Sequence, residues 1–201
     1  MNLETPLSEE TVRSLCIGDI AYLNGIVYTA RDAAHTRALK IIEEGAQLPF
    51  DLKNAALYHC GPIVRKVGRD GIEWKVLAAG PTTSARMNSL EPTFICHTGI
   101  RAIIGKGGMS VETVEAMQRC GCVYFAITGG AAVTTANKIA RVVDVAWLDL
   151  GMAEAMWAFE VRDFGPLVVA IDAHGKSLYD DVERTVVENI VKARKILGFR
   201  S

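Results

Sequence analysis

The stretch that decides the fold reads Ala78-Ala79-Gly80-Pro81-Thr82-Thr83-Ser84-Ala85-Arg86-Met87-Asn88. The apolar residues 76–79 predict a buried strand, Gly80-Pro81 ends it, and the hydroxyl side chains that follow stand where a helix would begin. A strand that stops and reopens as a helix leaves backbone N–H groups without partners, and Arg86 adds a guanidinium nearby. The combination predicts a seat for a carboxylate or phosphate, although an N-cap followed by a surface arginine explains the stretch better when it is taken alone.

Composition excludes several classes of protein. The 201 residues are 50% hydrophobic and 22% charged with a formal net charge of -1, so no overall field favours nucleic acid or an anionic membrane. No apolar run reaches the roughly 18 residues of a membrane span, and residues 1–10 are too polar for a signal peptide. We therefore expect one cytoplasmic domain over residues 1–201 that binds neither nucleic acid nor membrane.

The cysteines predict reduced thiols rather than a disulfide framework. They number five and are scattered through apolar segments at positions 16, 60, 96, 120 and 122. Cys120-Gly121-Cys122 lacks the spacing of a zinc or cluster motif, and two buried thiols explain it best. Because no Cys-x-x-Cys occurs, we expect no metal or iron–sulfur site held by this chain alone.

Strands, glycine-rich turns and helices alternate along the chain, which predicts an α/β fold. The predicted strands cover 17–30 (turned as a hairpin at Asn24-Gly25), 55–67 (interrupted at 59–62), 72–79 after a polar turn at 65–71, 100–104, 123–127, 142–147, 156–161 and 167–172. The predicted helices cover a short segment capped by Ser8, 36–44, 84–97 with a break or second start at Pro92, 110–119, 131–139 and the amphipathic 180–197, whose stripe is Val182, Val186, Ile190 and Ile196.

Several predicted strands end in unusual polar turns. These turns are Arg31-Asp32 with His35, Gly80-Pro81-Thr82-Thr83 with Arg86, Gly105-Lys106-Gly107-Gly108, and Thr128-Gly129-Gly130. In α/β sheets, ligands bind where strands hand over to helices. Two arginines and a lysine, without a comparable set of acidic partners in the same motifs, suit a ligand with two negative groups such as a small dicarboxylate. The P-loop and dinucleotide-binding spacings are both absent, which disfavours a nucleotide.

Each turn has an ordinary structural explanation when it is considered singly. A need for positive φ angles is enough to explain the glycines, and Asp32 can be an early-turn carboxylate favoured by the helix dipole. His35 on an alanine-rich helix is more often a satisfied buried histidine than an acid or base. Their joint occurrence at strand ends is what favours a binding site.

The motifs resemble one family, the β subunits of two-subunit class I iron–sulfur hydro-lyases, namely fumarate hydratase and L(+)-tartrate dehydratase. The resemblance covers nearly the whole chain in order. It rests on Thr-Ala-Arg31-Asp32-Ala-Ala-His35, His59-Cys-Gly61-Pro62-Ile-Val, Gly80-Pro81-Thr82-Thr83-Ser-Ala-Arg86-Met87, Gly105-Lys106-Gly107-Gly108-Met109 and Phe164-Gly165-Pro166-Leu-Val-Val with Asp172-Ala-His174-Gly175.

The resemblance implies a swivelling β/β/α domain with a mixed sheet and flanking helices. It also implies a partner α subunit that holds a [4Fe-4S] cluster on three cysteines, so that this chain binds no metal itself and completes the site. The expected assembly is a homo-oligomer of such heterodimers, and the expected substrate is a dicarboxylate, malate/fumarate or tartrate.

The resemblance also implies roles for individual residues. Arg31, Arg86 and Lys106 would hold the substrate carboxylates, with Thr83 and Gly107 as further substrate-binding positions. Thr82 would lie against the carbon that loses its proton and is the proposed base, paired with an aspartate of the α subunit. Asp32 and His35 are the other catalytic candidates in this chain.

The expected reaction is the reversible dehydration of (S)-malate to fumarate, chosen over tartrate dehydration only because it is the commoner metabolic task. Two readings of other classes stay open: a cluster-free module that captures small anions, and a self-sufficient isomerase or lyase that uses His35 and Asp32. A half-site must face its partner, so the strand ends should open onto exposed surface. Apolar residues around Met87, Met109 and Met152 would then contribute to that contact or to the core.

Overall fold

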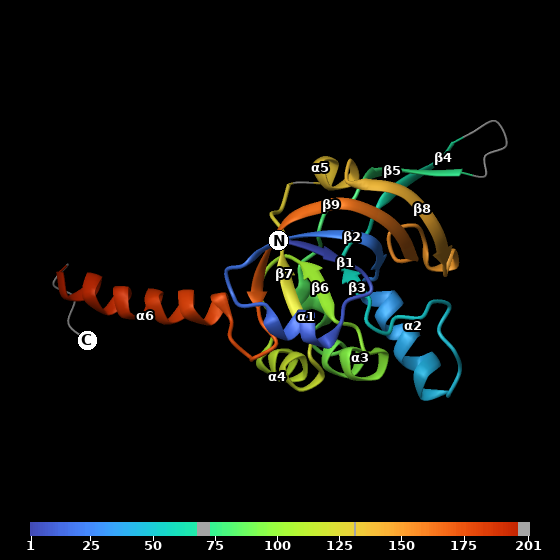
Figure 1. Ribbon diagram of the computed structural model, residues 1–201. Coiled ribbons are helices and arrows are strands. Elements are labelled where there is room, and N and C mark those ends of the chain that lie inside the picture. The colour runs from blue at the N-terminus through green and yellow to red at the C-terminus, as the bar shows by residue number, and fades with distance from the viewer. Residues whose placement is uncertain (68–72, 131, 197–201) are drawn as a thin grey trace.

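The computed structural model describes residues 1–67, 73–130 and 132–196 (Figure 1). The strands are β1 (Asn2–Glu4), β2 (Ile20–Thr29), β3 (Ala56–Tyr58), β4 (Ile63–Val67), β5 (Glu73–Ala78), β6 (Ala102–Gly105), β7 (Val123–Ala126), β8 (Ile139–Ala146) and β9 (Met156–Ile171). The helices are α1 (Glu9–Ser14), α2 (Asp32–Glu43), the 3-10 turn η1 (Ser84–Met87), α3 (Glu91–Thr98), α4 (Val111–Cys120), α5 (Ala132–Ala136), the 3-10 turn η2 (Leu148–Leu150) and α6 (Leu178–Ile196).

The main sheet is mixed and partly closed on itself. Strands β2, β3, β6 and β7 are parallel neighbours, and their connections run through helices, as parallel pairing requires. The long strand β9 pairs antiparallel with β7 at one side and with β2 at the other, so these strands form a barrel-like ring. β8 and β1 extend the sheet, while β4 and β5 form a separate hairpin.

Side-chain alternation along the parallel strands creates two cores. Leu57, Ile103 and Tyr124 point into a core shared with the helices. Their immediate neighbours, among them Ile104 and Phe125, point into a second core shared with β9. Figure 1 shows the resulting layers, with α2, α3 and α4 beneath the parallel strands and β8 and β9 above them. The predicted α/β class and its β/β/α layering are therefore confirmed.

Two strand predictions are wrong for the same reason. Asn24-Gly25 is not a hairpin turn but a bulged point within the continuous strand β2, where Gly25 has a φ of +98° and a Cβ would lie 2.6 Å from Thr5 Oγ1. Likewise, the two strands predicted at 156–161 and 167–172 are the single strand β9, with Asp163 at a φ of 48° inside it. β2 and β9 pair along most of their lengths, and register shifts absorb the irregular residues.

Local capping and breaking signals were predicted correctly. Ser8 Oγ accepts a hydrogen bond from the Thr11 N–H at 3.0 Å and starts α1. The strand break at residues 59–62 separates β3 from β4, and Pro92 lies in the first turn of a second helix, α3. The polar turn predicted at 65–71 lies largely outside the described residues.

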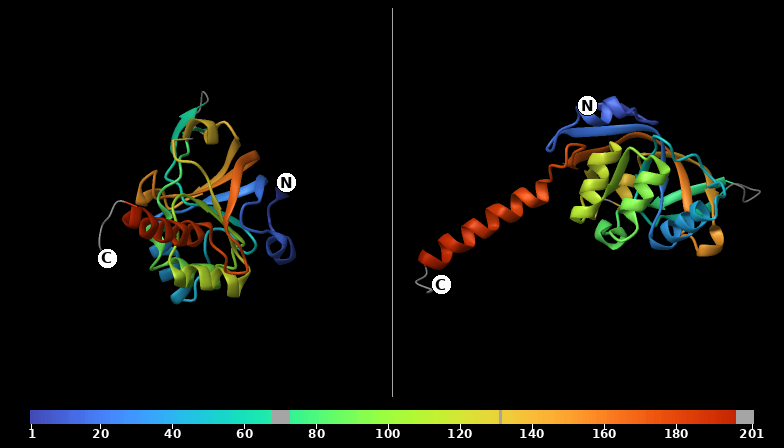
Figure 2. Two further views of the ribbon diagram at one scale, coloured as in Figure 1. Left: turned by 90° about the vertical axis from the view of Figure 1, so that its left-hand side faces the viewer. Right: turned by 90° about the horizontal axis from the view of Figure 1, so that it is seen from below.

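Helix α6 is amphipathic, as predicted, but its apolar stripe is not packed on the domain. It extends away from the layered body in Figures 1 and 2, and Val182, Val186, Val187 and Ile190 are exposed. The side chain of Ile196 and residue 197 lie outside the described part. None of the described helices is both long and apolar enough to cross a membrane.

Candidate active site

The predicted site residues meet at one edge of the sheet. Because β2, β3 and β6 run parallel, their carboxyl ends lie together, and they are followed by Arg31, His59 and Lys106 respectively. The turn 80–83 joins this edge through isolated bridges between Cys60 and Pro81 and between Thr83 and Lys106. Turns far apart in the sequence therefore form one surface.

The stretch around Thr82 is not the helix start that its sequence predicts. β5 before it is a half-exposed hairpin strand rather than a buried one, and η1 after it is a single 3-10 turn. Two of its backbone N–H groups are also paired: Thr82 donates to the His59 carbonyl at 2.7 Å, and Ser84 donates to the Lys106 carbonyl at 3.0 Å. The stretch therefore ties the ends of β3 and β6 together instead of offering a helix N-terminus to an anion.

Arg31 is held by an acidic partner that the motifs do not contain. Its Nε lies 3.2 Å from Glu154 Oε1, and Glu154 Oε2 accepts a hydrogen bond from the Ala33 N–H at 3.0 Å. Glu154 therefore caps the first turn of α2 and holds the guanidinium at the same time. The other end of the guanidinium lies over Gly61, where a Cβ would be 2.5 Å from Arg31 Nη1. Only a glycine leaves room for this placement.

Arg86 is paired with the predicted catalytic residue Asp32. Its Nε donates to Asp32 Oδ1 at 3.2 Å, and its Nη2 lies 2.8 Å from Oδ2. Both side chains are partly exposed, at 49% for Arg86 and 37% for Asp32. The expectation that the motifs hold no comparable acidic partners is therefore wrong for Arg86, whose partner Asp32 belongs to the Arg31-Asp32 turn, whereas the partner of Arg31 lies outside the motifs. Each guanidinium keeps N–H groups for a further anion.

Lys106 lies between two glycine turns. Its aliphatic stem passes over Gly129, whose added Cβ would be 3.8 Å from Lys106 Cδ. Gly107 has a φ of +78° and lies against the Thr83 methyl group. Among the residues that the structure describes, Lys106 takes part in no ion pair. It is thus the cation at this edge best placed to receive a ligand carboxylate.

His35 is buried beneath the edge rather than on it. Its side chain is fully buried, and its Nε2 lies 3.2 Å from Glu91 Oε2. Burial alone would lower the pKa of His35, but the Glu91 carboxylate outweighs burial and raises it. Direct acid or base chemistry by His35 on a surface-bound substrate is therefore disfavoured.

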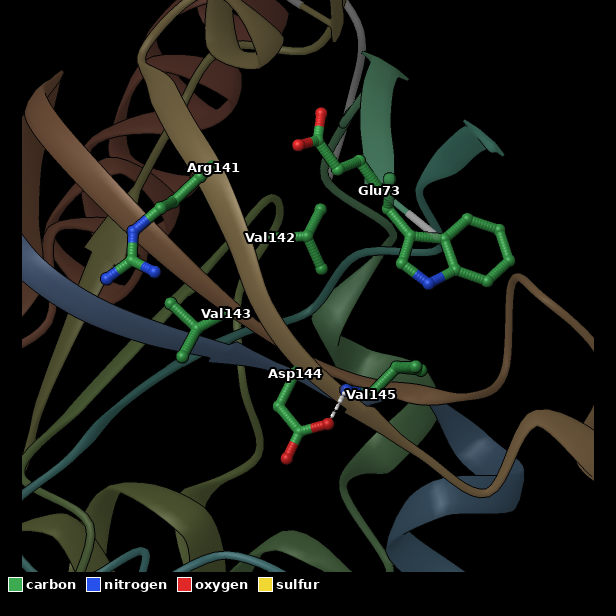
Figure 3. A pocket seen from close by; sticks show the side chains of 7 residues that line it. Glu73, Arg141, Val142, Val143, Asp144 and Val145 are labelled. Carbon is green, nitrogen blue, oxygen red and sulfur yellow. Dashed lines mark hydrogen bonds between the residues drawn. The ribbon is translucent and has the colours of Figure 1, made fainter. Parts of the chain in front are cut away.

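The strand-end surface is open, as expected for a half-site, since Thr83 and Arg86 are exposed. A pocket of about 530 Å3 lies elsewhere, between β5 and β8 (Figure 3). In Figure 3, Arg141 and Glu73 lie on either side of Val142, and Asp144 turns back to accept from the Val145 N–H at 2.7 Å. No predicted site residue lines this pocket.

The three methionines named as contact candidates differ in their burial. Met87 is fully buried and belongs to the core, while Met152 is 39% exposed and its Sδ accepts from the Val64 N–H at 3.4 Å. Met109 packs partly buried against the core on the helix side. Only Met152 has the exposure that a partner contact needs.

A comparison with known families identifies the family of this chain. The family model described as Fumarase C-terminus matches residues 1–182. The chain belongs to this family. It is 48% identical over 185 residues to a Methanocaldococcus jannaschii protein provisionally named L(+)-tartrate dehydratase subunit beta, a match that covers 92% of this chain and 93% of that protein.

Two further relatives carry related names. The L(+)-tartrate dehydratase subunit beta of Escherichia coli K12 is 39% identical over 186 residues, which are 92% of this chain and 90% of that protein. A Geobacillus stearothermophilus protein provisionally named fumarate hydratase class I is 41% identical over 190 residues, which are 94% of this chain but 35% of that protein. The resemblance predicted from the motifs is confirmed, and so is the hydro-lyase reaction class.

The family is of the iron–sulfur hydro-lyase type, and the cysteines of this member do not form a cluster site at the strand-end edge. Cys60 lies there alone, buried after β3. Cys16 and Cys122 precede β2 and β7, at the opposite end of the parallel strands. Cys96 and Cys120 approach each other from α3 and α4, with 2.6 Å between their Sγ atoms. Cys122 is buried as predicted, whereas Cys120 is only half-buried.

Three residues of this Fumarase C-terminus member were missed as site components: Glu154, Glu91 and His59. Glu154 lies in the turn before β9 and reaches Arg31 only because that turn packs against the start of α2. Glu91 looks like an ordinary first-turn carboxylate of α3. His59 belongs to the motif His59-Cys-Gly61-Pro62, and nothing in the sequence pattern indicates that it shares one buried position with Glu91.

Proposed function

We propose that this chain is the β subunit of an L(+)-tartrate dehydratase-type hydro-lyase that works with an α subunit. The relatives that match over nearly their whole length are named for tartrate dehydratase, while the match named for fumarate hydratase spans 35% of that protein. The comparisons thus favour tartrate as the substrate, whereas malate was the first expectation from the sequence. The proposed partners are the α subunit and a dicarboxylate substrate, in an oligomer of heterodimers.

The observation that carries the proposal is the set of cations at one open edge. Arg31, Arg86 and Lys106 come from three different turns and lie where β2, β3 and β6 end. Elimination of water begins by removing a proton from carbon next to a carboxylate, which places additional negative charge on that carboxylate. Fixed cations stabilise this charge more strongly than they stabilise the ground state, and that difference lowers the barrier.

Thr82 has a defined place in this scheme. Its backbone N–H donates to the His59 carbonyl, and its turn is bridged to Lys106 through Thr83, so Thr82 belongs to the same edge as Lys106. A threonine hydroxyl is a weak base by itself, and neighbouring positive charge stabilises its alkoxide form. We assign Thr82 to proton transfer at carbon, Arg31 and Lys106 to the carboxylates, and the Arg86–Asp32 pair to orientation of the second carboxylate, with Thr83 and Gly107 shaping the seat.

The residues present fit a cluster that the partner supplies, since this edge offers a single buried cysteine. When bound on the α subunit, a [4Fe-4S] cluster with a free iron supplies a Lewis acid for the departing hydroxyl. The residues of this chain then bind and orient the dicarboxylate, and Thr82 moves the proton.

Anaerobic reconstitution with the α subunit tests the proposal. We expect tartrate dehydration by the complex and a loss of about 10- to 100-fold in kcat/KM for Lys106→Met or Arg86→Gln, because each removes a charge-assisted contact of about 1.5–3 kcal/mol. Arg37→Gln is the matched control, since Arg37 lies on α2 but pairs with the exposed Asp149 at 2.7 Å. Full activity of the Lys106 variant, or tight tartrate binding by the isolated chain without turnover in the complex, contradicts it.

A further inference from the structure

A buried charged cluster lies directly beneath the strand-end edge. It consists of His35 from α2, His59 after β3 and Glu91 at the start of α3, and all three side chains are fully buried. His35 Nε2 and His59 Nε2 lie 3.2 Å and 3.1 Å from the same oxygen, Glu91 Oε2. The two imidazoles therefore share one carboxylate oxygen. Three polar groups at 0% exposure are costly to bury and therefore need an explanation.

The outer contacts of the two rings determine where their protons lie. His35 Nδ1 is 2.8 Å from the Arg31 carbonyl, which can only accept, so Nδ1 carries a proton. His59 Nε2 lies 3.1 Å from the Glu91 carboxylate, which can only accept, so a neutral His59 carries its proton on Nε2. His59 Nδ1 can then accept from the Ser84 hydroxyl, 2.9 Å away, while Tyr124 Oη donates to Ser84 Oγ at 2.9 Å.

The charges agree with this assignment. Burial by itself would raise the pKa of Glu91, but the two imidazoles outweigh burial and lower it to about 2. Burial lowers the pKa of His59 by more than Glu91 raises it, whereas Glu91 outweighs burial at His35. Together with the acceptor carbonyl at His35 Nδ1, these directions favour a Glu91 carboxylate with the extra proton on His35 rather than on His59.

The two histidines of the cluster are each joined to one turn of the proposed active site. His35 donates to the backbone carbonyl of Arg31 through its ring, and its own N–H does so at 2.9 Å. The His59 carbonyl accepts from the Thr82 N–H at 2.7 Å. The cluster thus lies at the point where separate turns of the site converge.

The turn that carries Lys106 is joined to the cluster through Ser84, the hydrogen-bond partner of His59. Ser84 contacts His59 Nδ1 through its hydroxyl and donates its backbone N–H to the Lys106 carbonyl at 3.0 Å. An added Cβ on Gly105 would lie 2.0 Å from Ser84 Oγ, so the serine side chain fits closely against the turn that carries Lys106.

We propose that Glu91, His35 and His59 are positioning residues that hold the turns of Arg31, Thr82 and Lys106 in register for the two carboxylates of the substrate. The inference rests on the proposed function and goes beyond it, because none of these side chains reaches the substrate. The cation at His35 and the anion at Glu91 lock α2 to α3, and the neutral His59 extends the contact to the other two turns.

A metal ion bound by the same residues is a competing explanation. The three donor atoms lie within 4.8 Å of one another. However, structural zinc sites use four protein ligands, whereas this cluster offers three, all fully buried. The number of ligands therefore favours a proton-bearing cluster over a metal centre.

The first test uses the complete α/β complex. Glu91→Gln keeps the shape and removes the charge, Ser84→Ala removes the bond to His59 without touching the ion pair, and Glu115→Gln is a matched exposed control on α4. We expect KM for the dicarboxylate to rise at least fivefold in both cluster variants, with iron content unchanged and Glu115→Gln like the wild type. Lower thermal stability with unchanged KM would mean a merely structural role and overturns the proposal.

The second test uses the chain alone and does not depend on activity. Nitrogen-15 NMR of the histidine rings should show His35 protonated on both nitrogens and His59 protonated on Nε2 only. Glu91→Gln should speed amide hydrogen exchange at Thr82 and Ser84 relative to Glu115→Gln. One equivalent of zinc in the purified chain with loss of the Nε2 protons overturns the proposal. If the wild-type complex is inactive, the proposed function fails, and these chain-alone measurements still decide the role of the cluster.

Discussion

The buried carboxylate of Glu91 should make the protein sensitive to acid. The pKa of Glu91 is lowered from 4.5 to about 2 in the folded protein, so the folded state favours the ionised form. The difference corresponds to about 3 kcal/mol at about 1.4 kcal/mol for each pH unit. This stability is present above the unfolded pKa of 4.5 and is lost as the pH falls from about 4.5 towards 2.

Substitution of Glu91 by glutamine isolates this contribution. At pH 7, Glu91→Gln should lower the free energy of unfolding by about 3 kcal/mol, which also agrees with the cost of about 3–5 kcal/mol for breaking a buried ion pair. The same interaction raises the pKa of His35, so its contribution is fully present below the ordinary value of 6.5 and is lost as the pH rises through the folded pKa. The difference between variant and wild type should shrink towards zero near pH 2.

Urea unfolding followed by far-ultraviolet circular dichroism, repeated from pH 7 down to pH 2.5, measures the difference directly. Glu115→Gln serves as the control because its side chain is exposed on α4. Parallel curves for wild type and Glu91→Gln over the whole range would refute the reasoning, since they would show that Glu91 has the same pKa in the folded and unfolded states.

Three other perturbations have defined outcomes. Gly61→Ala should raise KM about tenfold, because the new methyl group meets Arg31 Nη1 at 2.5 Å, and should lower thermal stability, because it also meets the Ala153 carbonyl at 2.9 Å; unchanged KM would contradict this placement. Thr82→Val should lower kcat by at least 100-fold with little change in KM, and an active variant would exclude Thr82 as the base. Mild treatment with oxidised glutathione should join Cys96 to Cys120, whose Sγ atoms are 2.6 Å apart, with a loss of 2 Da by mass spectrometry that is absent in Cys96→Ser.

The position of the site could be predicted from the sequence because its signals are local. Gly80-Pro81, Gly105 to Gly108 and the Arg31-Asp32 junction each mark the end of a strand through turn chemistry that needs no distant partner. Ser8 and Pro92 likewise act on the helix that begins beside them. Parallel strands bring the ends of β2 and β6 to one edge, so the alternation of strands and helices sufficed to place Arg31 and Lys106 together, whereas Arg86 joins them through tertiary bridges of the turn 80–83.

The acidic partners could not be predicted in the same way. Glu154 meets Arg31 across more than a hundred residues, and Glu91 meets His35 and His59 only after α2 and α3 pack on the same sheet face. A carboxylate in a first helical turn looks the same in sequence whether it is solvated or buried in an ion pair.

What the sequence determined by itself was the set of strand-end turns and the residue types on them, because turn and cap chemistry acts between near neighbours. What only the tertiary structure decided was the continuity of β2 and β9, which hydrogen bonding to distant strands maintains through Gly25 and Asp163. The three-layer packing likewise decided which cations are paired and which histidines are buried, because burial and ion pairing depend on groups that meet only when the layers close.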